Sequence, residues 1–264
     1  MAISVDTVYQ KVLALANKEQ RGYITPQEFN LLADKAQLDI FESYFHDLKT
    51  AYHKPKTNLP STDESDNIKT KLHPFLTNDI IILNSLVNSF SLPDDLYKID
   101  TMTYKYPISI YPAEYLTVPV EEISQQKSMY TETHPLLKAS KTRPVFTRIS
   151  NLPTQTTTTK KIAIYPDPTL IPAAELTLTV FTLFYWRKPI SPNWGYVLVE
   201  NQQGYKKALY NSNPGVSKNF ELHDSEEEAL VTRILQLSGI IIESPGLVEI
   251  AMTDNANTKA EQNN

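Results

Sequence analysis

The sequence predicts an α+β fold: a helical hairpin at the N-terminus, a central antiparallel β region, and one or more helices at the C-terminus. Three observations predict it. Apolar residues recur at helical spacing in residues 1–53, β-branched and aromatic runs alternate with prolines in residues 73–222, and an acidic helix start precedes a helical pattern in residues 223–264. We expect these segments, with a polar loop at residues 54–72, to form one integrated domain.

Helical spacing of apolar residues predicts a first helix over residues 4–16, with a serine as its N-cap. A second helix is expected to begin at Thr25 and to run to about residue 52. Thr25 can cap this helix, Pro26 suits its first turn, and Glu28 can complete a capping box. The two helices together form the predicted N-terminal hairpin.

The second predicted helix carries two apolar stripes on roughly opposite sides. One stripe fits the first helix. The other needs its own partner, because each large apolar side chain left in water forgoes about 1.5–3 kcal/mol. That partner is either the rest of this chain or a neighbouring subunit. The first stripe comprises Phe29, Ala33, Ala36, Ile40 and Tyr44, and the second, our candidate subunit interface, comprises Leu31, Leu38, Phe41, Phe45 and Leu48.

The middle of the chain is expected to be mainly β-structure, bounded by prolines that cannot donate to a strand ladder. Strands are expected at residues 80–87, 96–106, 145–149, 161–165, 176–187 and 219–222. A turn at 92–96, a short helix at 120–130 and an exposed hairpin tip at 154–159 are expected between them.

A C-terminal helix is expected to follow the acidic residues 224–227, which supply its cap and first turn. Gly239 is expected to end it, and another short helix can begin near Pro245. The polar tail over residues 253–264 is expected to fray. The apolar face of the main helix comprises Leu230, Val231, Ile234, Leu235 and Leu237.

The composition suits a folded protein and excludes several chemistries. Of the 264 residues, 41% are apolar and 10% aromatic, which is enough to fill a core. The chain has no cysteine, which excludes disulfides, thiolate metal sites and a cysteine nucleophile. A net charge of -5 argues against a surface that coats DNA or an anionic membrane, although a local basic patch stays open.

Neither a membrane span nor a secretory leader is expected. The longest apolar stretch, residues 80–87, contains Asn84 and Ser85 and falls far short of the roughly 20 residues that span a bilayer. No basic region precedes the first apolar residues, unlike in a signal peptide. We therefore expect a soluble protein.

The segment between the first two predicted helices, residues 17–28, falls on the ligand positions of an EF-hand loop, but its chemistry does not fit calcium. Arg21 puts a cation where an oxygen ligand is needed, and Asn17 stands where a carboxylate is usual. The five histidines show no zinc-site spacing, and no phosphate-binding glycine loop or nucleophile elbow occurs. We predict no catalytic residue, no cofactor and no metal.

The aromatic residues around position 190 have two interpretations. Trp186, Trp194 and Tyr196, with Arg187 nearby, could stack on sugars or bases. Residues 176–186, however, carry large apolar groups on both alternating faces, which favours a central strand packed on both sides. Exposure of the rings would favour a binding module, and burial would count against it.

Taken together, several segments resemble a family of tailed-bacteriophage structural proteins, the connector or ring proteins beneath the portal, as in podoviruses including crAss-like phages. The resemblance covers nearly the whole chain in matching order, and its motifs are structural rather than catalytic. Its most specific part is Val5-Asp6-Thr7-Val8-Tyr9 with the run from Leu13 to Asn30. Further matching segments are Leu92–Tyr97, Val120–Ile123, Arg143–Phe146, Arg187–Pro189, Pro192–Tyr196, Phe220–His223, Ile234-Leu235 and Gly239-Ile240.

The resemblance implies a non-enzymatic adaptor that forms a ring of about twelve copies. Such a ring docks on the portal or on another neck or tail ring and passes the genomic DNA into the tail without sequence-specific binding or a membrane. It implies assembly in the host cytoplasm and a place in the virion neck or tail. The acidic balance fits a channel wall that repels DNA weakly. The C-terminal tail would gain order on docking.

Three other readings stay open at this stage. The chain can be another tail or minor virion component, which copy number and location would distinguish. It can be a carbohydrate- or receptor-binding module built on Trp186, Trp194 and Tyr196. A hydrolase is the third, but no set of residues supports it.

Overall fold

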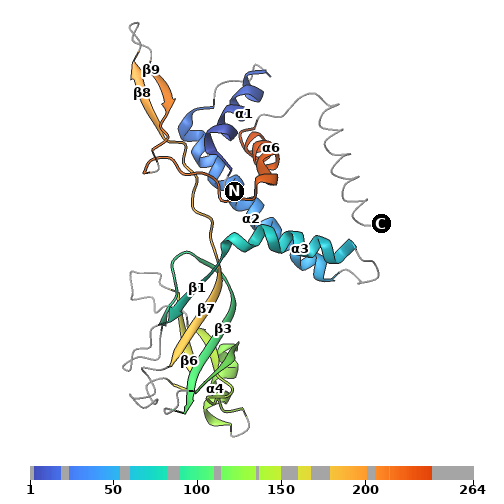
Figure 1. Cartoon of the computed structure of the whole chain (residues 1–264), viewed down its shortest axis with the longest axis vertical. Helices are drawn as coiled ribbons and strands as arrows, with labels where there is room; N and C mark the ends of the chain where they lie inside the picture. The colour runs from blue at the N-terminus through green and yellow to red at the C-terminus, as the bar shows by residue number, and fades with distance from the viewer. Residues whose placement is uncertain are drawn as a thin grey trace. The chain divides into compact units, whose positions relative to one another are not determined.

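A computed structural model describes residues 3–18, 24–53, 60–81, 90–109, 114–134, 137–149, 160–167, 179–200, 206–213 and 215–239. The chain divides into two compact units (Figure 1). Unit 1 combines both ends of the chain, Met1–Pro74 with Pro189–Asn264, and unit 2 is Phe75–Lys188. The residues described contain five α-helices and a seven-stranded sheet, which confirms a mixed α+β fold.

Unit 1 is built from helices and one β-hairpin. Its α-helices are α1 (Val5–Lys18), α2 (Pro26–His53), α3 (Pro60–Leu72) and α6 (Glu227–Leu237). A short 3-10 turn lies at Asp224–Glu226, another at His73–Phe75 crosses into unit 2, and the hairpin pairs β8 (Tyr196–Glu200) with β9 (Lys206–Tyr210). Helix α6 packs against both α1 and α2, and α3 packs against α2. The predicted N-terminal helices and the C-terminal helix are therefore present and belong to one unit.

The capping box predicted for α2 is present. The Glu28 side chain accepts hydrogen bonds from the Thr25 N–H at 3.0 Å and from the Thr25 hydroxyl at 2.8 Å, while the Glu28 N–H donates to the Thr25 hydroxyl at 3.3 Å. The hydrogen bond from the Thr25 backbone lowers the pKa of Glu28. The first apolar stripe of α2 faces the core of unit 1, because Phe29, Ala33, Ala36 and Tyr44 are all buried.

Unit 2 is a curled sheet with the strand order β1-β7-β3-β4-β5-β6-β2, carrying helix α4 (Gln125–Thr133). Its strands are β1 (Leu76–Ile81), β2 (Phe90–Ser91), β3 (Leu96–Ser109), β4 (Glu114–Glu122), β5 (Val145–Ile149), β6 (Lys161–Tyr165) and β7 (Val180–Arg187). Register shifts between β3 and β7 mark irregularities of the kind that bend a strand.

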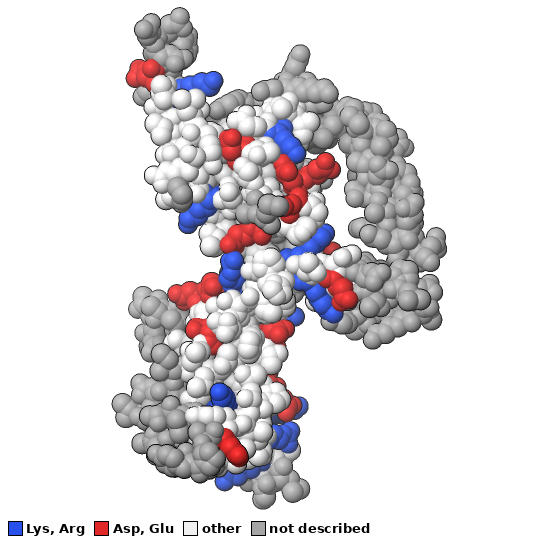
Figure 2. Space-filling model, in the orientation of Figure 1, with Lys and Arg blue, Asp and Glu red and all other residues white. Residues whose placement is uncertain are grey.

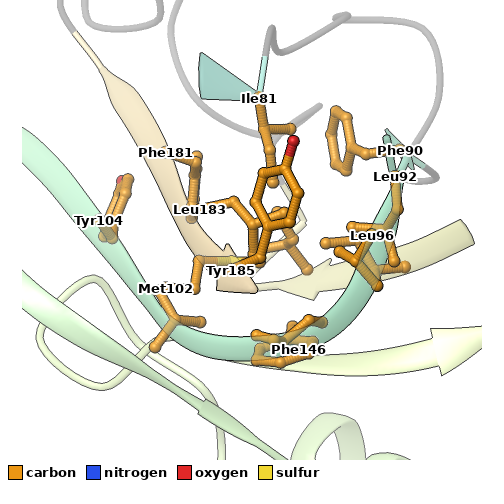
Figure 3. Packing of buried hydrophobic residues seen from close by; sticks show 14 of the residues in the cluster. Ile81, Phe90, Leu92, Leu96, Met102, Tyr104, Phe146, Phe181, Leu183 and Tyr185 are labelled. Carbon is orange, nitrogen blue, oxygen red and sulfur yellow. The ribbon is translucent and has the colours of Figure 1, made fainter. Parts of the chain in front are cut away.

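One apolar cluster fills the concave side of the unit 2 sheet (Figure 3). Tyr104 stacks on Phe181 with ring centroids 4.4 Å apart, and Leu183 is fully buried beside them. The cluster draws on strands far apart in the sequence, so it cannot form until β3 and β7 pair. Its buried members are Ile81, Phe90, Leu92, Leu96, Ile99, Met102, Tyr104, Tyr106, Val120, Phe146, Ile162, Ile164, Phe181, Leu183 and Tyr185.

Several predicted strands are confirmed. β5 and β6 occupy residues 145–149 and 161–165 as predicted, and β7 is a central strand between β1 and β3. β1 covers the start of the strand predicted at 80–87, but it begins at Leu76. Residues 82–87, 154–159, 176–178, the segment near Pro245 and the tail 253–264 lie outside the described residues.

Four expectations about the fold are wrong. Residues 60–72 form α3 rather than a loop, and Lys69 and Lys71 in its last turn complement the helix dipole. The helix predicted at 120–130 is present as α4 (Gln125–Thr133), but its predicted start is wrong: residues 120–122 end strand β4, because Val118 and Val120 favour a strand. β4 and β5 pair in parallel, so the sheet is mixed rather than antiparallel.

The fourth wrong expectation is the strand at 219–222, where the structure has only an isolated bridge between Ile3 and Phe220. The predicted acidic cap of the C-terminal helix also differs: the His223 side chain accepts the Ser225 N–H at 3.3 Å and so caps the preceding 3-10 turn. Gly239 has a φ of 71° directly after α6, as a helix-ending glycine requires.

Candidate subunit interface

The five residues predicted as a subunit interface do not share one face of α2. Leu31 is 75% exposed and Leu38 is 37% exposed, whereas Phe41 is completely buried. Phe45 and Leu48 are half-buried, and the Phe45 ring meets Phe41 edge-on at 5.2 Å. The reason is geometric. Phe41 follows Leu38 by three residues, so its side chain points about 60° away from that of Leu38 around the helix axis, which is enough to place it in the core. Leu31 and Leu38 are the two exposed members, and we term them the α2 face.

A second exposed apolar surface of unit 1 was not predicted. It is the β8–β9 hairpin, which has no third strand among the residues the structure describes. A two-stranded hairpin is only marginally stable alone. Its large apolar side chains are exposed: Val197 by 51%, Leu198 by 57%, Val199 by 42% and Leu209 by 46%. We term these four residues the hairpin surface.

Trp194 fixes the base of the hairpin to the helices. Its indole N–H donates to the Asp6 carboxylate at 2.9 Å, and its ring lies 4.3 Å from that of Tyr9. Tyr196 and Tyr210, paired across the two strands, stack on it with centroids 5.9 and 5.8 Å away.

Because Trp194 is only 3% exposed, it cannot present a ring to a sugar. Trp186 and Tyr196 are half-buried. Burial therefore counts against the binding module that Trp194 was expected to anchor.

Two amides on α2 hold the segment that carries the hairpin. Gln37 is 1% exposed; its amide donates to the Ile190 carbonyl at 2.9 Å and accepts the Glu221 N–H at 3.0 Å. Asn30 donates to the Asn193 side chain at 2.8 Å and accepts the Trp194 N–H at 2.7 Å. Sequence analysis missed both residues, although their seven-residue spacing beside the apolar stripe places them on one face of the helix.

One ion pair ties α2 to α6, and another ties α3 to the 3-10 turn that precedes α6. Arg233 donates twice to the Asp39 carboxylate, at 2.6 and 3.0 Å. Lys71 pairs with Glu226 at 2.5 Å and lies 5.9 Å from the Tyr44 ring centre. Burial, and then the nearby Glu226 carboxylate, raise the pKa of Tyr44. Tyr44 therefore stays protonated at neutral pH and cannot act there as a base.

In unit 2, burial and a hydrogen bond to Asp95 at 3.1 Å raise the pKa of Tyr185 to about 12. Tyr185 also stays protonated at neutral pH. Its hydroxyl therefore links Asp95 to the sheet and cannot act as a general base at that pH.

Among the residues that the structure describes, no group of three or more His, Asp or Glu side chains could hold a metal ion. The central positions of the EF-hand-like segment, residues 19–23, lie outside that set. Within the same part of the chain, no helix is both long and apolar enough to cross a membrane. Figure 2 shows acidic and basic side chains interspersed over the face in view, with no continuous basic surface there.

Comparison with known proteins gives no assignment: no family model matches the chain, and no curated protein matches it.

Proposed function

We propose that the chain is a non-enzymatic virion structural protein, a head-to-tail connector that forms a ring below the portal and continues the DNA channel into the tail. The observation that carries the proposal is the pair of separate apolar surfaces on unit 1, the α2 face and the hairpin surface. A cyclic ring needs two different surfaces on each subunit, because one surface of a copy meets the other surface of the next. The sequence resemblance to connector proteins supports the same assignment.

The charge of the chain agrees with a channel component. A wall that binds DNA tightly would slow its passage, because each neutralised phosphate adds affinity. The net charge of -5 instead favours weak repulsion of DNA. We propose the portal and the adjacent neck or tail rings as partners, with about twelve copies in the ring. The proposal requires no cofactor, no metal and no membrane, and it places the protein in the virion after assembly in the host cytoplasm.

Copy number and position in purified virions test this function. Quantitative mass spectrometry with the portal as internal standard is expected to give about one copy per portal subunit. Cryo-electron microscopy of the neck is expected to show its density between portal and tail. A much higher ratio, with density along the tail or on the head, would assign the protein to another structural class. Absence from particles would refute a virion role.

A further inference from the structure

The α2 face bears a row of apolar side chains at seven-residue spacing. Leu31 and Leu38 are exposed, and Phe45, half-buried, continues the row. Residues seven apart stay on one side of a helix, because the row drifts by only about 20° per seven residues. A second helix laid against this row would cover all three side chains.

A row of charges of alternating sign runs beside the apolar row. Glu28, Lys35, Glu42 and Lys49 are all exposed and follow one another at the same seven-residue spacing. Successive members lie about 10.5 Å apart along the helix, too far to pair with one another. Lys35, Glu42 and Lys49 form no ion pair with another residue that the structure describes. The row thus offers charges that a docked helix can pair with.

The order of the charges along α2 is complementary to that of a second, antiparallel copy of α2. When two copies of α2 pack antiparallel with their Leu38 side chains opposed, Leu31 of each copy meets Phe45 of the other. The charge rows then run along the same side of the seam. Glu28 of each copy comes opposite Lys49 of the other, and Lys35 opposite Glu42. All four pairs have opposite signs.

A parallel arrangement gives none of these pairs. It would place the charge row of one copy against the row Gln27, Asp34, Phe41 and Leu48 of the other, on the opposite side of the apolar row. Only Lys35 meets an opposite charge there, the exposed Asp34, so the parallel arrangement gives two opposite-sign pairs against four in the antiparallel one. We propose that the α2 face docks on the α2 face of a second copy, antiparallel, about a two-fold axis at Leu38. In such an isologous contact each pair occurs twice, as a two-fold axis requires.

This contact does not rest on the proposed function. An α2 face holds one partner at a time, so a ring contact through the same face and the two-fold contact exclude each other. If the ring forms, the two-fold dimer belongs to the unassembled protein and opens before the ring closes.

Single cysteines test the geometry, since the chain has none of its own. In Leu38→Cys the two thiols face each other across the axis, within the Cα separation of about 4.4–6.8 Å that a disulfide needs. In the matched control Leu31→Cys the two thiols lie about 21 Å apart, fourteen residues along the helices. Mild oxidation of the purified protein is expected to link L38C into dimers and to leave L31C monomeric on non-reducing gels. Equal linkage of both variants, or none of L38C, would overturn the proposal.

Charge reversal tests the partner. K35E or E42K alone puts like charges together at two symmetric places, and sedimentation equilibrium at low salt is expected to show dimerisation weakened about tenfold or more. The double variant K35E/E42K restores opposite signs at both places and is expected to recover the wild-type dissociation constant. A double variant as weak as the single ones, or a wild-type protein monomeric at about 100 μM, would refute the contact. Normal ring assembly by a protein whose unassembled L38C variant does not link would refute the contact while still supporting the connector.

Discussion

Gln37 offers the most demanding test of how the hairpin is held. Replacing it with Met keeps the side-chain length but removes both the donor to the Ile190 carbonyl and the acceptor of the Glu221 N–H. A buried polar group that loses its partner costs about 1–3 kcal/mol. Because both backbone groups are only partly buried and water can reach them in part, we take the lower end for each and expect Q37M to lower the free energy of unfolding of unit 1 by about 2 kcal/mol.

Urea unfolding measured by tryptophan fluorescence gives this number. The chain has two tryptophans, and Trp186 belongs to unit 2, so a W186F background makes Trp194 the reporter of unit 1. Gln27→Met is the matched control, because Gln27 is exposed on the same helix and its amide makes only a long, exposed hydrogen bond of 3.4 Å to the Tyr196 hydroxyl. Its expected cost is within about 0.5 kcal/mol. Equal midpoints for Q37M and Q27M would refute the claim that the buried Gln37 amide helps to fasten the hairpin segment to α2.

Further predictions concern the core, the hairpin and pH. Phe41→Ala is expected to destabilise unit 1 by about 3–5 kcal/mol and Leu31→Ala by less than about 0.5 kcal/mol, measured by the same urea titration; equal costs would contradict the division of the predicted interface. The double substitution Val197→Asp and Leu198→Asp is expected to leave the thermal midpoint within about 2 °C of the wild type. It is expected to abolish ring assembly, as seen by negative-stain microscopy; a normal number of rings would show that the hairpin surface is not part of the ring contact. The raised pKa of Tyr185, about 12, predicts stability that is complete below its unfolded pKa of about 10 and is lost as the pH rises toward 12. In Y185F, alkaline unfolding followed together with tyrosinate absorbance is expected to lack the loss of stability that Tyr185 causes in the wild type. An alkaline transition identical to that of the wild type would contradict this role of Tyr185.

Local patterns in the sequence predicted the elements whose causes are local. The capping box of Thr25 and Glu28 marks the start of α2, and alternation of apolar residues marks β5 and β6 at their observed bounds. Helix α3 was missed because its sequence has too few apolar residues to show a helical period. The β8–β9 hairpin was missed because its apolar residues are exposed, so burial gives its strands no one-sided pattern to detect.

The residues of the predicted interface differ in burial for a different reason. A helix face is a continuous angle, and the sequence does not say where the core ends. Leu38 and Phe41 differ by about 60° around α2, and only the packing of α6 and α3 decides that one is outside and the other inside. The same packing makes Asn30 and Gln37 part of the interior hydrogen bonding, although amides on a helix are ordinarily exposed. Tertiary contacts, and not the local sequence pattern, therefore determine which of these α2 residues are buried.

The two exposed surfaces of unit 1 are joined through Trp194, and the ring that we propose depends on this link. Trp194 stacks on both ends of the hairpin base and is itself held by Asp6 and Asn30, on α1 and α2. These partly buried hydrogen bonds thus determine the angle between the hairpin surface and the α2 face. A ring closes only when the rotation from one surface to the other is the same in every copy. Loosening the Trp194 anchor is therefore expected to produce open or variable arcs even where each contact keeps its affinity.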